Sequence, residues 1–411
     1  MTQFYGCQGI WREKSVTTKF KVYAIFIIIL ILLGWGGRLI PSRVEITDFG
    51  IIQVLGIDSG INNGVNLSMV AENEKGSEDD KPKIGNENIV TSSGKSYNDC
   101  ISGLENYSDK IFIGGHIENI IIGEEICKEN LVRAVDFISK ASEIRLNSNV
   151  FISKGTNAGD FMREGTSDEF SMAARISNIN LADQTLTEEK NTEVTDVINI
   201  LLSEDKCGVV QAIELVENGK PSGREFILST SKDEGKKFMQ YAGYALIKDA
   251  KLVDYLNIDA SSGYDFIKNN HPKQNVYIEK DGEILGINFG GSKTKVSFNF
   301  DGEKLKEIVI KTKTKNEIMQ SSNGKNIFKE NLGATEKLVE NEVKHRIESA
   351  INVAKNYQVD YIGFKKMLEM KHPYKWNKIK DNWENIFNEV PIRIEVESKI
   401  NRSYNLLSIV D

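Results

Sequence analysis

The longest uninterrupted apolar run lies near the start of the chain, at residues 22–37, and contains no charged residue. As a helix this run would extend about 24 Å, which approaches the about 30 Å of a bilayer core. Four basic residues precede it: Arg12, Lys14, Lys19 and Lys21. Because basic residues stay on the cytoplasmic side, the pattern predicts a single transmembrane anchor at residues 22–40. Residues 1–21 would form a short cytoplasmic tail, and the rest would lie outside.

Two other interpretations of this run are a cleavable signal peptide and a lipoprotein signal. A lipoprotein signal requires a cysteine to receive the lipid, and Trp35 follows Leu32-Leu33-Gly34 where that cysteine would be expected. A small-residue cleavage site of the Ala-x-Ala type does not follow either. We therefore favour an uncleaved anchor with no lipid-acceptor cysteine.

Beyond residue 43 the apolar positions alternate between strand-like and helix-like spacing. Strands are predicted at residues 44–58, 65–70, 110–125, 149–153, 209–216, 225–228, 241–247, 282–289, 294–300, 308–314 and 391–397. Helices are predicted at residues 96–107, 128–140, 335–354, 364–370 and 377–387, with a further helix capped by Thr156 and one that ends at residues 199–202. The helix near 335–354 has the clearest apolar face, formed by Val339, Val343, Ile347, Ala350 and Ala354.

This mixture predicts an α+β fold in which a single anchor precedes an ectodomain of about three mixed-sheet domains. We place the N-terminal domain at residues 44–195, a middle domain at 196–300 and a C-terminal α/β domain at 301–411. The length of 411 residues agrees with two or three domains.

Composition narrows the functional classes. The chain is 40% hydrophobic and 27% charged, with a net charge of −7, so a nucleic-acid partner is not expected. Its four cysteines, Cys7, Cys100, Cys127 and Cys207, form no C-x-x-C pair, and we expect no metal site. Cys100 and Cys127 could form a disulfide in an exported body, but buried free thiols are the interpretation we favour.

Two glycine-rich stretches resemble phosphate-binding loops without meeting the motif. Gly94-Lys95-Ser96 lacks the required glycine five residues earlier, and in residues 290–294 Ser292 separates glycine from lysine. We interpret both as turns and expect no bound cofactor.

A few other residues invite a functional interpretation. His116 could sense pH or contact a ligand, although a structural, hydrogen-bonded histidine is the commoner case. Trp376 and Trp383 could form an aromatic platform, but core packing is favoured. The adjacent carboxylate pairs Glu124-Glu125 and Asp79-Asp80 should point to different faces, and we name no catalytic residue.

Several segments together resemble one known family. They are Arg43 with Gly56-Ile57-Asp58; the stretch from Phe112 through His116 to Gly123-Glu124; residues 241–253; and Asp360-Tyr361-Ile362-Gly363-Phe364 followed by Pro373, Trp376, Trp383 and Phe387. In order and spacing they are similar to the Ger(x)C family, the C subunits of spore germinant receptors. The resemblance covers most of the chain beyond residue 43.

The resemblance implies a non-enzymatic receptor subunit in the inner spore membrane, with the ectodomain on its outer face. Its partners would be the polytopic A and B subunits, and the complex would respond to small-molecule nutrients. The chain departs from the family in lacking the lipid-acceptor cysteine. The alternative is a membrane-anchored extracytoplasmic solute- or wall-binding protein unrelated to germination; an anchored hydrolase is a third possibility.

Overall fold

The computed structural model describes residues 13–36, 49–72, 88–106, 110–165, 172–176, 191–217, 237–270, 275–280, 283–321 and 332–403. The chain divides into two compact units, Met1–Phe49 and Gly50–Asp411. Several predicted features lie outside the described residues: the strand at 225–228, the carboxylate pair Asp79-Asp80, Cys7, Arg43, residues 1–12 of the predicted tail and residues 44–48 of the first predicted strand.

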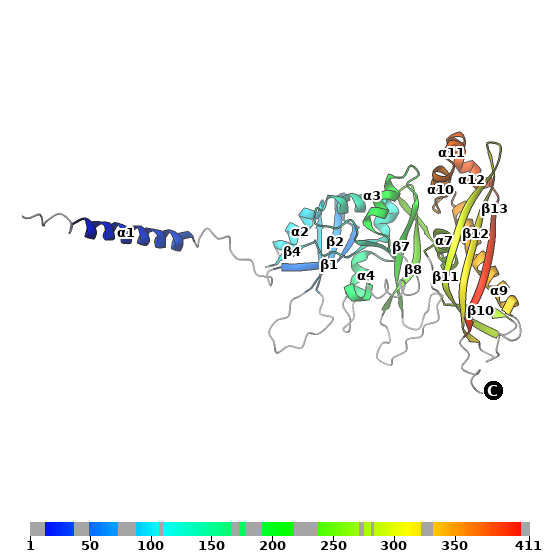
Figure 1. Cartoon of the computed structure of the whole chain (residues 1–411), viewed down its shortest axis with the longest axis horizontal. Helices are drawn as coiled ribbons and strands as arrows, with labels where there is room; N and C mark the ends of the chain where they lie inside the picture. Colours follow the sequence, from blue (N-terminus) through cyan, green and yellow to red (C-terminus); the bar gives the residue numbers. More distant parts are fainter. Residues whose placement is uncertain are drawn as a thin grey trace, which may run out of the picture. The chain divides into compact units, whose positions relative to one another are not determined.

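The first unit contains one helix, α1 (Glu13–Gly36), among its described residues (Figure 1). It includes the predicted apolar run except Gly37, and its side chains at residues 20–31 are exposed, from Phe20 at 78% to Ile31 at 55%. Within the described parts of the chain, no helix has both the length and the apolar character needed to span a membrane.

The second unit begins with a large mixed sheet. Its nine strands are β1 (Phe49–Ser59), β2 (Val65–Glu72), β3 (Asn88–Gly94), β4 (Ile111–Ile113), β5 (Asn119–Gly123), β6 (Asn149–Lys154), β7 (Gly208–Glu217), β8 (Lys237–Lys248) and β9 (Lys251–Tyr255). Their order is β3-β2-β1-β5-β6-β7-β8-β9, and β4 pairs with β1. The neighbours from β1 to β7 in this order run parallel, which suits a sheet that is covered on both faces.

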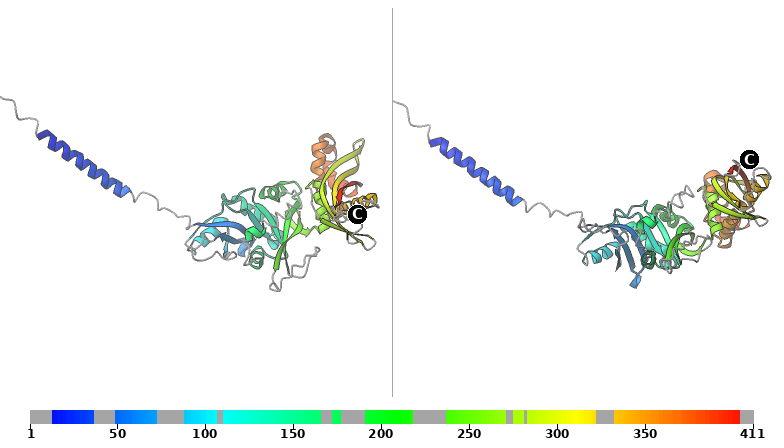
Figure 2. Two further views of the ribbon diagram at one scale, coloured as in Figure 1. Left: turned by 60° about the horizontal axis from the view of Figure 1, so that its bottom comes forward. Right: turned by 90° about the horizontal axis from the view of Figure 1, so that it is seen from below.

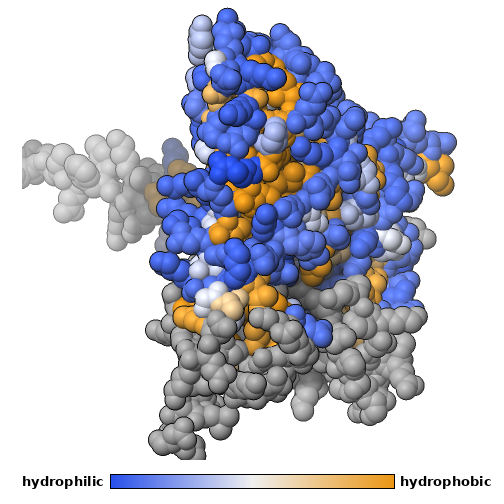
Figure 3. Space-filling model, turned by 90° about the vertical axis from the view of Figure 1, so that its right-hand side faces the viewer, coloured by the Kyte–Doolittle hydropathy of each residue, from blue (hydrophilic) through white to orange (hydrophobic). Residues whose placement is uncertain are grey.

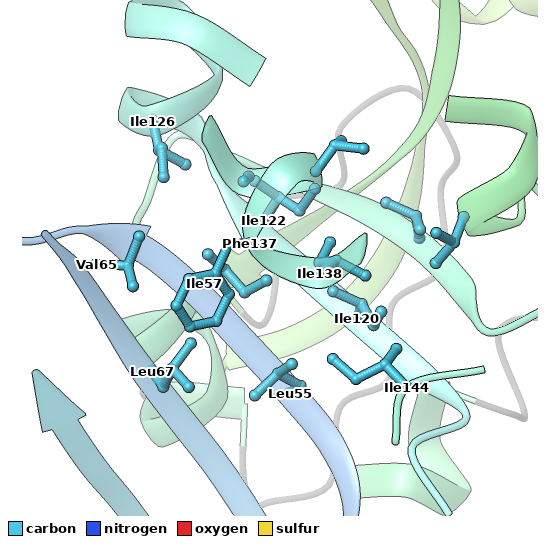
Figure 4. Close-up of a cluster of buried hydrophobic side chains, with 14 of the residues drawn as sticks. Leu55, Ile57, Val65, Leu67, Ile120, Ile122, Ile126, Phe137, Ile138 and Ile144 are labelled. Carbon is cyan, nitrogen blue, oxygen red and sulfur yellow. The ribbon is translucent and has the colours of Figure 1, made fainter. Parts of the chain in front are cut away.

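Helices cover both faces of the large sheet (Figures 1 and 2). Residues of α2 (Tyr97–Glu105), α3 (Glu124–Lys140) and α6 (Val194–Leu202) form one core with the sheet, and residues of α4 (Ala158–Gly165) form a core on the other face. Figure 4 shows the first core, where Phe137 and Ile138 of α3 meet Leu55, Ile57 and Ile122 of the strands. This double cover explains why every residue of β5 is buried.

The predicted strand at residues 110–125 was wrong in its extent. The chain forms β4, a turn through Gly114-Gly115, and then β5, and α3 begins at Glu124. The predicted helix start at residue 128 lies close to a break inside α3, because Asn130 is extended and its side chain accepts a hydrogen bond from Val132 N–H at 3.0 Å. Asn130 therefore caps the longer, second part of the helix.

A four-stranded sheet and its helices form the rest of the second unit. The strands are β10 (Asn275–Lys280), β11 (Glu283–Asp301), β12 (Lys304–Ser321) and β13 (Ile392–Ser403), in that order. The helices are α7 (Ile258–Lys268), α9 (Leu332–Asn356), α10 (Phe364–Lys371), α11 (Pro373–Ile379) and α12 (Trp383–Glu389), with a short 3₁₀ turn, η3 (Lys380–Asn382), before α12. The predicted apolar face of α9 is buried in the core of this sheet, as expected. Gly263 lets α7 approach α9, because a Cβ there would lie 2.0 Å from the carbonyl oxygen of Arg346.

One edge of this sheet keeps apolar side chains near the surface. Ile392, Ile394 and Val396 of β13 are only partly buried against the core. Figure 3 views the side on which β13 lies and shows a hydrophobic band bordered by hydrophilic residues.

Three further predictions change in the structure. The strands predicted at 282–289 and 294–300 are one long strand, β11, interrupted by a bulge between Phe289 and Gly291. The helix predicted at 377–387 is split, because η3 separates α11 from α12. Strands β7, β8 and β9 lie in the predicted middle domain, yet they continue the sheet of the preceding domain. The domain limits at residues 195 and 300 stay a prediction.

Candidate functional site

A polar cluster lies where three neighbouring parallel strands end. Asp58 is the penultimate residue of β1, Glu124 directly follows β5, and Gly155 directly follows β6. Because parallel strands end at the same edge of a sheet, these residues come together although they are far apart in the sequence. The cluster is a candidate site, since Asp58 and Glu124 both belong to the segments that carry the family resemblance.

Asp58 caps a helix that lies about a hundred residues further along the chain. Its Oδ1 accepts a hydrogen bond from Ala158 N–H at 2.7 Å, and its Oδ2 accepts one from Gly159 N–H at 2.9 Å. These are the first two backbone donors of α4, which lack partners within the helix. Burial raises the pKa of Asp58, although the two N–H donors oppose this. The carboxylate thus joins α4 to the end of β1.

Two glycines make room for this contact. A Cβ at Gly123 would lie 1.9 Å from Oδ1 of Asp58, so β5 can pass the carboxylate only if this residue has no side chain. A Cβ at Gly56 would lie 2.7 Å from the sulfur of Met162 and 3.1 Å from the Cβ of Ala158, so Gly56 lets α4 pack closely on β1. In Gly56-Ile57-Asp58, the glycine admits the helix, Ile57 enters the opposite core and the aspartate caps the helix.

Glu124 connects α3, the β6–α4 loop and β9. It accepts hydrogen bonds from Gly155 N–H and, at 3.0 Å, from the hydroxyl of Tyr255, and it pairs with Lys128. Burial alone would raise the pKa of Glu124, but the bonds from Lys128, Gly155 and Tyr255 outweigh it and lower that pKa. Burial and the neighbouring carboxylate of Glu124 raise the pKa of Tyr255. Glu124 therefore stays ionised and Tyr255 stays protonated near neutral pH.

The oxygens of this cluster already have partners within the protein. Both oxygens of Asp58 bond to backbone N–H groups, and Glu124 bonds to three donors from three elements. The described residues contain no group of three His, Cys, Asp or Glu side chains placed to hold a metal ion. What the arrangement does is to fix the relative positions of β1, α3, α4 and β9.

A second aspartate plays a similar part beside the four-stranded sheet. Asp360 accepts hydrogen bonds from Gly363, Phe364 and Lys365 N–H, at 2.9, 2.9 and 2.6 Å, at the start of α10. Gly363 is left-handed, with φ of +82°, and Tyr361 donates to the carbonyl of Ala350 in α9 at 2.8 Å. Burial raises the pKa of Asp360 to about 6, although the three N–H donors oppose the shift.

The other residues singled out in the sequence do not join these clusters. Gly94-Lys95-Ser96 leads into α2, where the Ser96 hydroxyl accepts from Asp99 N–H at 3.2 Å, so this stretch is a helix start. The stretch 290–294 lies inside β11, and our interpretation of it as a turn was wrong.

His116 is exposed in the turn between β4 and β5, and so it is not part of a buried strand. No described residue forms a hydrogen bond with its imidazole. Glu124 and its neighbour Glu125 differ in side-chain exposure, 14% against 73%, so they point to different surroundings as predicted.

Trp376 and Trp383 are core residues, as favoured. Both are buried, their ring centroids are 5.6 Å apart in an edge-to-face arrangement, and Trp383 stacks on Phe387 at 5.9 Å. They lie on α11 and α12, so the contact joins two helices across η3.

The cysteines of the described region are free thiols. Cys100 and Cys127 are buried and not bonded to each other. Burial raises the pKa of Cys100 to about 11, and burial also raises the pKa of Cys127. Both are therefore protonated side chains within the core.

Gly56-Ile57-Asp58 and residues 360–364 belong to the segments that resemble the family, but the sequence alone does not predict what they bond to. The capped groups of Asp58 are about a hundred residues away, and no local pattern marks that pairing. For Asp360 a local signal was present, since an aspartate followed by a glycine and an apolar run is typical of a helix start.

Comparison with known proteins agrees with these signatures. Residues 42–215 match the model of the family described as "Spore germination protein N-terminal domain", and residues 242–404 match "Spore germination B3/GerAC like, C-terminal". Spore germination protein B3 of Bacillus subtilis (strain 168) is 22% identical over 395 residues, which are 94% of this chain and 98% of the relative. Spore germination protein KC of the same organism is 21% identical over 390 residues, or 88% and 91%.

A solved structure shares the fold. The crystal structure of the GerBC protein superposes with a TM-score of 0.52 at 19% identity and covers 84% of this chain and 96% of that one. The two family models and this likeness define the class as a spore germination protein with a mixed α+β body. The chain belongs to the Ger(x)C family.

Proposed function

We propose that this chain is the non-enzymatic C subunit of a nutrient germinant receptor and that spores need it to germinate in response to small-molecule nutrients. The observation that carries the proposal is coverage: two spore germination models match in order over residues 42–215 and 242–404. The relatives B3 and KC align over nearly their whole lengths as well. The matches therefore extend over most of this chain and nearly all of both relatives.

The capped clusters support a role in assembly. The oxygens of Asp58 and Glu124 bond to backbone and side-chain donors of the protein itself. Such contacts make a stiff body, and a stiff body is suited to holding partner subunits in fixed positions. The partners in this proposal are the membrane-embedded A and B subunits, and the nutrient binds to the complex.

The proposal includes a single-pass anchor in the inner spore membrane. The exposed apolar side chains of α1 support it, together with the basic residues that precede them. In this arrangement the N-terminus is cytoplasmic and the body lies on the outer face. Anchoring would keep the body near its partners at high effective concentration. It would need no lipid, since Trp35 stands where the lipid-acceptor cysteine would be expected.

Germination of spores that lack this chain tests the proposal. We expect loss of dipicolinate release in response to a subset of nutrients, restored when the wild-type chain is supplied. The full chain, tagged and isolated from spore membranes, should bring two polytopic membrane proteins with it. Recovery of the chain alone, with an unchanged response to each nutrient, would contradict the proposal and favour a separate solute- or wall-binding protein.

A further inference from the structure

The four-stranded sheet has an open edge along part of β11. Strand β10 pairs with β11 only from Glu283 to Asn288. From Thr294 onward, β11 is paired with β12 on one side, and none of the described strands lies on its other side. An open edge of this kind presents backbone groups to which another strand can bond.

The side chain of Asn269 shows which backbone groups face outward. Its Oδ1 accepts from Thr294 N–H at 2.5 Å, and its Nδ2 donates to Thr294 C=O at 3.0 Å. The amide thus bonds to β11 as a residue of a neighbouring strand would. Because the direction alternates along an antiparallel strand, the backbone groups of Val296 and Phe298 also point away from β12.

Within the described parts of the chain, one of these outward groups has a hydrogen-bond partner. Lys371, at the end of α10, donates to Val296 C=O. No described residue bonds to the N–H of Val296 or to the N–H and C=O of Phe298. This short edge can therefore accept an added strand, and that strand would displace the amine of Lys371 from Val296 C=O.

A basic hollow of about 590 Å³ lies beside this edge. Four lysines line it, Lys268, Lys295, Lys311 and Lys371, and no acidic residue does. Of these, Lys311 is paired with Glu395 at 2.8 Å. Apolar lining comes from Ile267 of α7 and Met367 of α10. The hollow is therefore positive on its solvent side and apolar toward the helices.

We propose that this edge binds an extended acidic segment of a partner protein as an added β-strand. Backbone bonds would form with Val296 and Phe298. Alternate side chains of the segment would meet the exposed Lys295 on the solvent face, and the others would lie beside Ile267 and Met367. The amine of Lys371, once displaced, would pair with a carboxylate of the segment. An alternation of acidic and apolar residues is the sequence that fits. This goes beyond the receptor role and does not depend on it.

Binding of designed peptides to the full chain in detergent tests the proposal. The probe is a short blocked peptide of alternating Glu and Val, and the same peptide with Lys in place of Glu is its control. We expect the acidic peptide to bind, with an affinity that falls as salt is added, and we expect the basic peptide not to bind. Failure of the acidic peptide to bind would overturn the proposal.

Backbone methylation separates strand addition from simple anion binding. Two further acidic peptides are methylated on backbone nitrogens. In the first peptide every valine is N-methylated, and in the second every glutamate is. Only one set of N–H groups can face β11, the valines in an antiparallel arrangement and the glutamates in a parallel one. Loss of binding with one of the two peptides supports an added strand. Loss with both, or with neither, contradicts it.

Charge reversal locates the binding on the protein. Lys295→Glu combined with Lys371→Glu should raise the Kd for the acidic peptide about tenfold. The control is Lys366→Glu, an exposed lysine of the same helix outside the hollow, which should leave binding unchanged. Equal weakening by the control would place the binding elsewhere. The peptide comparisons remain decisive even if the double variant folds poorly.

Discussion

At the scale of single residues, two aspartates cap helices that follow them in the sequence. Asp58 caps α4 and Asp360 caps α10, each through backbone N–H groups at 2.6–2.9 Å. Each contact also needs a particular glycine: Gly123 leaves space for the carboxylate of Asp58, and Gly363 takes the left-handed conformation at the start of α10. Asp58, Gly123, Asp360 and Gly363, which belong to the segments that resemble the family, thus each have a structural role.

Gly123→Ala should destabilise the protein. The new methyl group would lie 1.9 Å from Oδ1 of Asp58, so β5 must shift or the cap of α4 must open. We expect a loss of about 2–4 kcal/mol in the free energy of unfolding, measured by chemical denaturation.

The control for this substitution is Gly333→Ala in the first turn of α9, where a Cβ meets nothing within 4 Å. It should be neutral or raise stability by up to about 1 kcal/mol. Similar losses in the two variants would show that the contact with Asp58 is not the cause.

Asp360 should make stability depend on pH in the direction opposite to a salt-bridged carboxylate. Its pKa is about 6 in the folded protein against 3.8 ordinarily, so the folded state holds the proton more tightly. The contribution of Asp360 to stability should therefore fall as the pH rises from about 4 to about 6. Asp360→Asn cannot ionise and should flatten this part of the profile of melting temperature against pH.

The matched control is Asp381→Asn, an exposed residue of η3. It should leave the profile as it is in the wild type. An Asp360→Asn variant whose melting temperature changes between these two pH values just as that of the wild type does would contradict the assignment to Asp360.

At the scale of elements, the two edges of the four-stranded sheet are covered to different extents. On β13, Glu340 accepts from Ser398 N–H at 3.3 Å and Glu336 accepts from Ile400 N–H at 3.1 Å. Helix α9 therefore occupies part of that edge with carboxylates, which is one way in which proteins prevent strands from pairing with other molecules. On β11, Asn269 and Lys371 occupy the edge only in part.

Removing both carboxylates from the β13 edge should promote self-association. In Glu336→Ala with Glu340→Ala, the N–H groups of Ser398 and Ile400 lose their acceptors beside the partly buried Ile394 and Val396. We expect the apparent mass to rise with protein concentration in sedimentation experiments.

Glu348→Ala, an exposed residue of the same helix, is the control and should behave as the wild type does. Equal behaviour of the double variant and the wild type would mean that the two glutamates do not protect the edge.

At the scale of the whole molecule, the described residues comprise one apolar helix and a body of two sheets. The first unit contributes α1, and the second contributes both sheets and their helices. Within the second unit, Lys248 donates to Tyr357 C=O at 2.9 Å, and Lys365 pairs with Glu204 and Asp205 at 2.9 and 2.8 Å. These bonds connect the region of the large sheet with the helices of the small one.

The anchor proposal makes a prediction about the complete chain. The chain should remain with the membrane after a high-salt wash and need detergent for extraction, because an apolar helix is not released by salt. A variant that begins at Val44 should appear in the soluble fraction. Intact mass should include residues 1–21, and a shorter mass would instead indicate cleavage after the apolar run.

The pattern of apolar residues determined much of the local structure. Period predicted α9, β1, β2 and β6, because these depend on neighbours within a few residues. The helix predicted after Thr156 forms as α4, but the predicted cap was wrong: Asn157 caps it, since its Oδ1 accepts from Asp160 N–H at 2.6 Å. The order of the signature segments also determined the family, since that order is a property of the chain itself.

Only the tertiary structure decided how distant segments meet. It joined β7, β8 and β9 to the first sheet, placed Asp58 on the backbone of α4, and left the edge of β11 beside four lysines. It also separated α11 from α12 where the sequence predicted one helix. The physical reason is that strand pairing and helix capping across a hundred residues depend on the packing of the whole core, and a local sequence pattern does not contain that information.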